Sequence, residues 1–434
     1  MTAQNQSIPD NNISSNPASD ERPKAVLESQ KILKAIAVGI TSSVQGLERQ
    51  MLISDMMSRT DETVKEKLHT VMNYLLTRML SLGASDLDIG GYGSQGSIWY
   101  RIFGSKKPDR VLGTFSPDET NILIQSILGE RQRSFLFENR SLDFSHMLFG
   151  NGDDFRRFRA NAYFELDQLA LNMRAINNVI RPFKTLELHA NVTKVLSLAH
   201  TKEGLCLVTG ITGSGKSSTL DSIIDANNHT VEGHIVIIAS PIEYVHRSDK
   251  CIIRHREVGR DVLSFRDGAV QALRQDPDII MLGELRDPET IMTALEITDS
   301  GHKVFSTLHT GSAVESIDRI IGETPPIEQE RVRYRLADTL RCVISQKLVP
   351  SFDGKRILAK EILLGTPSVR AAIKNNNTSE IYQMLNEGFE HGMTTLEQDL
   401  KRLYVQKKIS LENAMNYANN KRRLQQLLQI QQTD

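Results

Sequence analysis

The sequence predicts an α/β fold with a mainly parallel sheet covered by helices, preceded by a smaller α+β domain. Two observations predict the larger domain. From about residue 192, short apolar strands alternate with helical patterns, and a glycine-rich loop at 210–217 joins one such strand to a helix. A third observation predicts the smaller domain, because alternation with period two marks strands at 97–103 and 158–164.

The composition is that of a multidomain globular protein. The chain has 434 residues, 39% hydrophobic and 24% charged, which suits two or three domains. Its 52 basic and 53 acidic side chains give a net charge of −1, which argues against a protein that coats nucleic acid. The sequence lacks an apolar run of the roughly 18 residues that span a bilayer and a secretory leader, so we expect a cytoplasmic protein.

Six segments follow one another along the chain. Residues 1–24 are rich in Asn, Ser, Gln, Asp and Pro, and we expect a disordered tail. Residues 25–62 form a helical N-terminal extension, and 63–180 form the α+β domain, whose first helix buries Leu68, Val71, Leu75 and Met79. A linker at 181–190, the parallel-sheet domain at 191–366 and a helical region at 367–434 complete the chain.

The strand at 158–164 places arginines on one face. Phe158, Ala160 and Ala162 alternate with residues that include Arg157 and Arg159, so both arginines point to the same side of the strand. By itself this pattern also fits an ordinary solvated face.

The loop at 210–217 carries the sharpest chemical signal. It reads G-x4-G-K-S between an apolar strand and a helical pattern, which is typical of a phosphate-binding loop whose backbone N–H groups surround the phosphates. Lys216 then reaches the β- and γ-phosphates, and the Ser217 hydroxyl binds Mg²⁺. The predicted nucleotide-binding residues of the loop are Gly210, Thr212, Gly213, Ser214, Gly215, Lys216, Ser217 and Ser218.

Further polar residues stand next to other strands of the same sheet. The strand at 279–282 is followed by Glu284, a candidate to orient or deprotonate the attacking water. Glu243 follows another apolar strand, and His302 and His309 flank the strand at 304–306. Alone, Glu243 and the histidines are weak signals, since such residues are often structural.

Four segments together resemble a known family. GITGSGKSST, SPIEYVH, ALRQDPDIIMLGELRD and SGHKVFSTLHTGSAVESIDRII occur in this order and spacing. They resemble the type II/IV secretion ATPase superfamily, and specifically the PilT-like ATPases of type IV pilus retraction (twitching motility). The resemblance begins near Lys65 and leaves about 60 preceding residues unexplained.

The resemblance implies a fold and an assembly. The fold is a RecA-like P-loop ATPase core with an N-terminal PAS-like α+β domain and a helical C-terminal region. The assembly is a homohexameric ATPase motor that uses ATP and Mg²⁺. It is peripheral at the inner membrane and acts on a pilus platform protein there. No nucleic-acid partner is expected.

The resemblance also implies roles for individual residues. Glu284 is the Walker B acid, Glu243 the Asp-box acid, and His302 and His309 are the His-box residues; these four and Lys216 form the predicted catalytic set. Arginines that reach nucleotide from the N-terminal domain fall among Arg157, Arg159 and Arg174. One departure concerns the Asp box, where Ala239-Ser240 replace the usual acidic pair.

Several alternatives stay open. Pilus-assembly and type II secretion ATPases usually carry a tetracysteine zinc insertion, which three scattered cysteines cannot build, so retraction is favoured. A type IVB secretion or conjugation ATPase shares the same build. Ala239-Ser240 motivate a nucleotide-gated interaction ring with little hydrolysis. A RecA-like nucleic-acid motor shares the phosphate loop but is disfavoured by the neutral charge.

Overall fold

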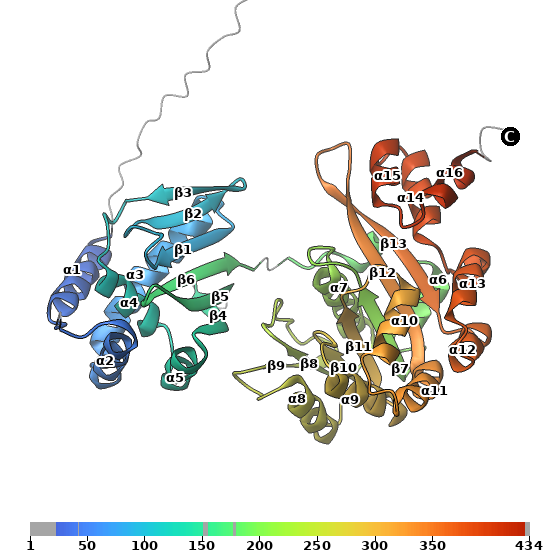
Figure 1. Ribbon diagram of the computed structural model, residues 1–434, viewed down its shortest axis with the longest axis horizontal. Helices are drawn as coiled ribbons and strands as arrows, with labels where there is room; N and C mark the ends of the chain where they lie inside the picture. The colour runs from blue at the N-terminus through green and yellow to red at the C-terminus, as the bar shows by residue number, and fades with distance from the viewer. Residues whose placement is uncertain (1–22, 42, 151–154, 177–178, 430–434) are drawn as a thin grey trace, which may run out of the picture. The chain divides into compact units, whose positions relative to one another are not determined.

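A computed structural model describes residues 23–41, 43–150, 155–176 and 179–429. The chain forms two compact units, Met1–Ala175 and Ile176–Asp434 (Figure 1). The predicted disordered tail, 1–24, lies almost entirely outside the described residues.

The first unit is built on a six-stranded antiparallel sheet of order β3-β2-β1-β6-β5-β4. Five helices accompany it in the described part of the unit: the last three contact the sheet face that carries Leu87, Ile89 and Phe158, and the first two pack on those three helices (Figure 1). The strands are β1 (Asp86–Gly90), β2 (Ile98–Ile102), β3 (Ser105–Asp109), β4 (Ser141–Phe149), β5 (Phe155–Glu165) and β6 (Gln168–Ala175). The helices are α1 (Lys24–Val38), α2 (Gly46–Arg59), α3 (Glu62–Ser81), α4 (Pro117–Ser126) and α5 (Glu130–Asn139).

Two helices follow directly from their sequence patterns. The apolar face predicted over 68–80 is the buried face of α3, with Leu68, Val71 and Met79 fully enclosed. Helix α4 begins with a capping box between Ser116 and Glu119 and has a proline in its first turn, both of which are local sequence signals of a helix start.

The residues expected to form an extension are part of the first unit's core. On α1 and α2, Leu33 and Ile53 are 0% exposed and belong to the same apolar cluster as α3. The Arg49 guanidinium on α2 donates two hydrogen bonds of 2.6 and 2.7 Å to the Asp118 carboxylate on α4. Such a bidentate pair fixes orientation as well as distance.

The second unit contains a seven-stranded sheet of order β13-β12-β7-β11-β10-β8-β9, in which β13 is antiparallel to β12 and the other pairs are parallel. Its strands are β7 (Gly204–Thr209), β8 (Gly233–Ala239), β9 (Cys251–Glu257), β10 (Ile279–Leu282), β11 (Lys303–Leu308), β12 (Leu340–Pro350) and β13 (Arg356–Leu364). The strands expected at 279–282 and 304–306 are β10 and β11, and those expected before the loop at 210–217 and before Glu243 are β7 and β8, which confirms the alternation.

Helices surround this sheet. The boundary between the two units lies earlier in the chain than expected. The expected linker at 181–190 belongs to the second unit, because Phe183–Leu186 forms the 3₁₀ helix η1 and Leu186 is buried in that unit's core. The other helices are α6 (Ala190–Leu196), α7 (Lys216–Thr230), α8 (Phe265–Ala272), η2 (Leu273–Gln275), α9 (Pro288–Asp299), α10 (Ala313–Gly322), α11 (Gln329–Thr339), α12 (Pro367–Lys374), η3 (Thr378–Glu380), α13 (Ile381–Glu387), η4 (Gly388–His391), α14 (Leu396–Val405), α15 (Leu411–Tyr417) and α16 (Lys421–Gln429).

The helical C-terminal region has two parts. Val369, Ile373 and Leu385 of α12 and α13 join the core around the parallel strands. Leu396 and Leu424, on α14 and α16, belong to a separate small cluster built against β12 and β13. The last three helices therefore form a distinct layer on the β12–β13 hairpin.

The three cysteines are all buried and unbridged. Cys206 and Cys342 lie opposite each other on β7 and β12, and burial raises the pKa of both thiols. Burial raises the pKa of Cys251 to about 11. No helix within the described ranges is long and apolar enough to cross a bilayer.

Candidate nucleotide-binding site

The glycine-rich loop lies at the carboxyl end of β7. Thr209 ends the strand and Lys216 begins α7, so residues 210–215 form the whole connection. Gly210 and Gly215 have φ angles of +147° and +89°. A Cβ on Gly210 would collide with the Ser214 hydroxyl and the Gln346 carbonyl. The tight turn therefore requires glycine, and it brings backbone amides to the N-terminus of α7.

Lys216 lies beneath this loop. Its Nζ donates to the carbonyl oxygens of Gly210 (2.8 Å) and Ile211 (3.2 Å), and the side chain is largely buried. Burial lowers the pKa of Lys216, while the charges of Glu284 and Glu243 oppose this shift. Both predicted acids thus act electrostatically on the predicted phosphate-binding lysine.

Glu284 follows β10, two strands away from the loop in the order β7-β11-β10. Its carboxylate forms an ion pair with Arg286 and lies 3.6 Å from Nε2 of His309. Burial and the charge of Lys216 lower the pKa of His309, and Glu284 opposes them. Neutral imidazole is therefore the favoured form beside this carboxylate.

Glu243 is held by the segment that follows β8. The Ser240–Pro241 bond is cis, and the next amide, of Ile242, donates to the Glu257 carboxylate at 3.2 Å. Glu243 itself is exposed. At the position where the family's acidic pair is expected, this chain has the buried residue Ala239. The space beside it is small, because a Cβ added to Gly283 would lie 3.2 Å from the Ala239 Cβ.

His302 does not join this group. It precedes β11, whereas His309 follows it, and a six-residue strand is about 20 Å long. The His302 carbonyl accepts from Gly204 at the start of β7, and its Nδ1 lies 2.9 Å from the Ser300 hydroxyl. The resemblance puts both histidines in the catalytic set, but only His309 lies beside Glu284, because parallel strands place their two ends at opposite edges of the sheet.

One supporting residue was missed at the sequence level. Gln346, on β12, is 1% exposed, and its amide donates to the Ser214 carbonyl (2.8 Å) while its carbonyl accepts from the Thr219 hydroxyl (3.0 Å). It therefore holds the phosphate loop and the first turns of α7 together. The sequence feature that could have indicated Gln346 is a single amide side chain within the mainly apolar run CVISQKLV.

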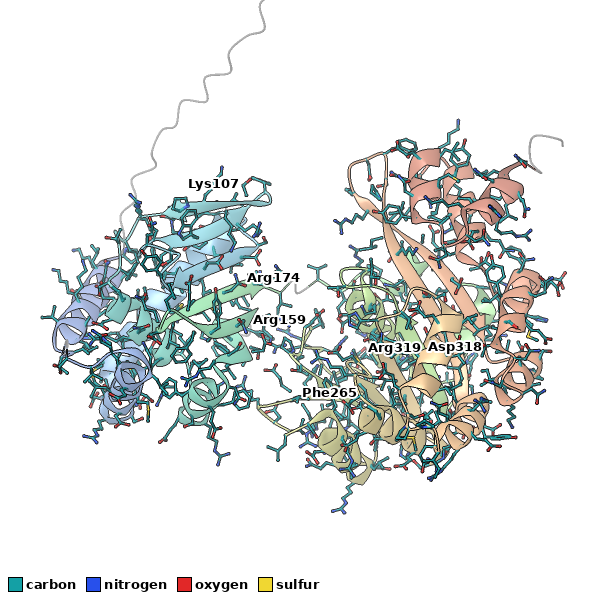
Figure 2. All side chains as sticks on the ribbon, in the orientation of Figure 1. Lys107, Arg159, Arg174, Phe265, Asp318 and Arg319 are labelled. Carbon is teal, nitrogen blue, oxygen red and sulfur yellow. The ribbon has the colours of Figure 1, made fainter. Side chains whose placement is uncertain are left out.

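The candidate arginines all lie on strands of the first unit. Arg157 is buried and Arg159 exposed, although both occupy the same face of β5. Arg174, on β6, lies directly opposite Arg159 and binds the Asp86 carboxylate at 2.8 Å (Figure 2).

The site has the donors that magnesium and nucleotide need. Among the described residues, no group of three or more His, Cys, Asp or Glu side chains is arranged to hold a metal ion. Mg²⁺ in nucleotide sites is held mainly by phosphates, water and one or two protein oxygens, so a single hydroxyl such as that of Ser217, next to Lys216 in the chain, fits this arrangement.

Comparison with known proteins identifies the family. The model of the type II/IV secretion system protein family matches residues 155–432. The chain belongs to this family. It is 40% identical over 300 residues to the type IV pilus retraction ATPase PilT of Pseudomonas aeruginosa, covering 69% of this chain and 85% of the relative.

Solved structures of family members show the same fold. The pilus retraction motor PilT with bound ADP superposes with a TM-score of 0.73 at 38% identity, covering 82% of this chain and 98% of the other. The Legionella pneumophila ATPase DotB gives 0.70 at 29% identity, covering 80% and 94%. The predicted architecture, with a RecA-like core, is confirmed, and the chain is a P-loop ATPase of this family.

Proposed function

We propose that this protein is an ATP-driven motor for type IV pilus retraction. The observation that carries the proposal is the joint presence of Lys216, Glu284 and His309 at one sheet edge, in a chain that matches a retraction ATPase over most of that relative's length. The proposed working form is a homohexamer in the cytoplasm, peripheral to the inner membrane, that acts on a pilus platform protein.

The residues of the site divide the chemistry among themselves. The amides of 210–217 and the Lys216 ammonium bind the phosphates, and Lys216 stabilises the charge that develops on the γ-phosphoryl oxygens. Ser217 would hold Mg²⁺, which when bound would neutralise part of the phosphate charge. Glu284 accepts the proton of the attacking water, with Glu243 as the second acid facing Lys216.

Arg159 is the best candidate for an arginine that completes a neighbouring subunit's site. Like charges directly opposite each other on adjacent strands are unfavourable, and Asp86 neutralises Arg174 but not Arg159. Among the described residues Arg159 has no ion pair, so its guanidinium is available for an anion. We expect Arg159→Ala to lower turnover more than ADP affinity.

Phosphate release tests the enzymatic part of the proposal. Lys216→Ala and Glu284→Ala should each lower turnover at least a hundredfold, since each removes charge stabilisation or the base. The exposed Lys202→Ala and Glu232→Ala in the same unit serve as matched controls and should keep wild-type rates. Turnover in Lys216→Ala or Glu284→Ala equal to the controls would refute the assignment. ATP binding without phosphate release in the wild type would instead favour the non-hydrolysing ring suggested by Ala239-Ser240.

The cellular output needs a separate experiment. If the motor retracts pili, deletion of the gene leaves cells with excess surface pili and no twitching, and Glu284→Ala reproduces that phenotype. The match to the type II/IV secretion system protein family favours a secretion motor as the second candidate. Normal pili and twitching, with loss of protein or DNA export, would support that candidate and exclude retraction.

A further inference from the structure

The segment that follows His309 is anchored mainly by the helix it leads into. Arg319 donates to the His309 carbonyl (3.0 Å), and the Thr310 and Ser316 hydroxyls lie 2.6 Å apart. The Gly311 amide donates to Glu315 (2.6 Å), again on α10. Three hydrogen bonds therefore join the His309 segment to the N-terminal turns of α10.

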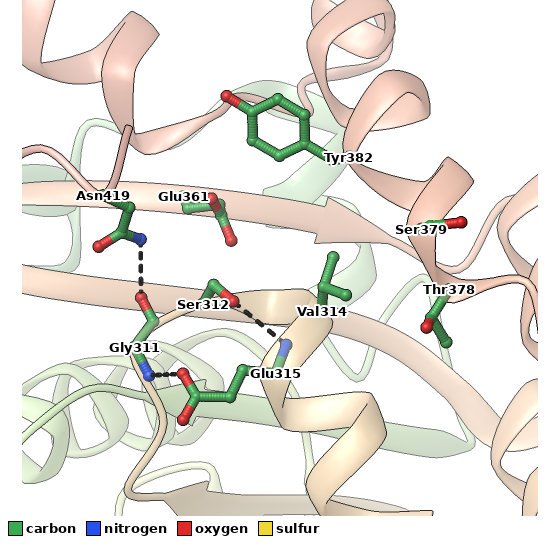
Figure 3. Close-up of a pocket in the computed structure, with 9 residues that line it drawn as sticks. All are labelled: Gly311, Ser312, Val314, Glu315, Glu361, Thr378, Ser379, Tyr382 and Asn419. Carbon is green, nitrogen blue, oxygen red and sulfur yellow. Dashed lines mark hydrogen bonds between the residues drawn. The ribbon is translucent and has the colours of Figure 1, made fainter. Parts of the chain in front are cut away.

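Two further anchors come from outside α10. The Ala313 amide donates to the Glu361 carboxylate on β13 at 2.7 Å, and the Gly311 carbonyl accepts from the Asn419 amide at 3.1 Å (Figure 3). Asn419 lies between α15 and α16, in the C-terminal helical layer. The His309 segment is thus tied to β13 and to that layer.

The Glu361 carboxylate interacts with the first residue of each of two helices. It is 3% exposed, and besides Ala313, the first residue of α10, it is stabilised by the amide of Leu396, the first residue of α14. Both helices direct the positive end of their dipole at this group. A buried acceptor shared by two helix N-termini couples the positions of those helices.

A lysine extends the same network to the phosphate loop. Lys347 Nζ donates to the Asn419 side-chain oxygen (2.6 Å) and to the Tyr417 carbonyl (2.8 Å). Lys347 is adjacent to Gln346, which holds the loop from the other face of β12. A cavity of about 360 Å³ borders Gly311, Glu361, Tyr382 and Asn419 (Figure 3), so polar contacts rather than close apolar packing join the parts here.

We propose that Glu361 is a positioning residue for ATP hydrolysis. Through the start of α10 it holds His309 in contact with Glu284, and through the start of α14 it makes the C-terminal helical layer part of the control of turnover. The inference rests on the proposed function, since it concerns the rate of that reaction.

The principal test is Glu361→Gln in the full chain. Glutamine keeps the shape but lacks the charge and the second acceptor oxygen, so kcat should fall about tenfold while KM for ATP and the affinity for fluorescent ADP stay within twofold. Asn419→Ala should lower kcat two- to threefold in the same manner. Asn413→Ala is the matched control, because this neighbour in the layer donates to the Pro350 carbonyl (3.0 Å), away from the His309 segment.

A pH profile separates positioning from a general loss of structure. Burial raises the pKa of Glu361 to about 7; Glu397 adds to the shift, and Lys347 with the two amides opposes it. Tyr382 and Glu315 also border the cavity. As the pH falls from 8 to 6, Glu361 gains a proton and becomes neutral, as glutamine is. The ratio of the wild-type kcat to the kcat of Glu361→Gln should therefore become smaller.

Two results would overturn the proposal. One is a folded Glu361→Gln protein with kcat within twofold of wild type at pH 8. The other, decisive if Glu361→Gln does not fold, is an Asn419→Ala protein that matches Asn413→Ala. Both leave the motor assignment intact, whereas absence of wild-type hydrolysis would reject the assignment itself.

Discussion

Replacing Ile53 by alanine tests whether α1 and α2 belong to the folded first unit. Ile53 is 0% exposed, within the core that also contains α3. Truncating a fully buried isoleucine costs about 2–5 kcal/mol in lost burial and cavity formation. With a urea dependence of about 2 kcal/mol per molar for a unit of this size, a loss of about 3 kcal/mol moves the unfolding midpoint by about 1.5 M.

The assay uses the single tryptophan. Trp99 lies on β2, and its indole donates to the Ser94 carbonyl at 3.1 Å, so its fluorescence reports the first unit even in the full chain. Leu52→Ala is the control, since this neighbouring side chain is 40% exposed and its loss should shift the midpoint by less than about 0.3 M. Equal midpoints for Ile53→Ala and Leu52→Ala would refute the reasoning and make α1 and α2 a dispensable appendage.

Two more predictions concern the second unit. Gln346→Leu should weaken ADP binding about tenfold in calorimetry, because it leaves the Ser214 carbonyl and the Thr219 hydroxyl without their buried partner; an unchanged affinity would contradict a role for Gln346 in holding the loop. Glu361 has a folded-state pKa of about 7 against an unfolded value near 4.5, so the fold retains a proton that the unfolded chain loses. The stability due to this group is therefore full below pH 4.5 and lost between pH 4.5 and 7, by about 3 kcal/mol. Unfolding of wild type and Glu361→Gln followed by circular dichroism at pH 5 and 8 checks this, and a wild-type pH dependence equal to that of the variant would contradict it.

Features that depend only on residues close together in the sequence could mostly be predicted from it. The phosphate loop, the face of α3 and the starts of α4 and α9 depend on residues within a few positions of one another. At the start of α9, for example, the Asp287 carboxylate accepts from the Thr290 amide at 2.8 Å and caps the helix. The four central strands were evident because buried parallel strands are continuously apolar.

Long-range partners could not be predicted in this way. Gln346 and Glu361 act on segments more than 30 residues away, and nothing in their neighbourhoods indicates those partners. The sequence shows that His302 and His309 flank one strand, but the resemblance alone assigned both to the catalytic set, and the whole of β11 separates them. The boundary near 181–190 was misplaced because Pro182 suggests a linker, whereas Leu186 packs into the second unit.

The burial of all three cysteines has a practical consequence. Their thiols are enclosed and have raised pKa values, so at neutral pH they react slowly with maleimides and iodoacetamides. One cysteine introduced on the surface of each unit would then carry a spin label or fluorophore without background. The wild-type sequence thus already suits measurements of how the distance between the two units changes during an ATP cycle.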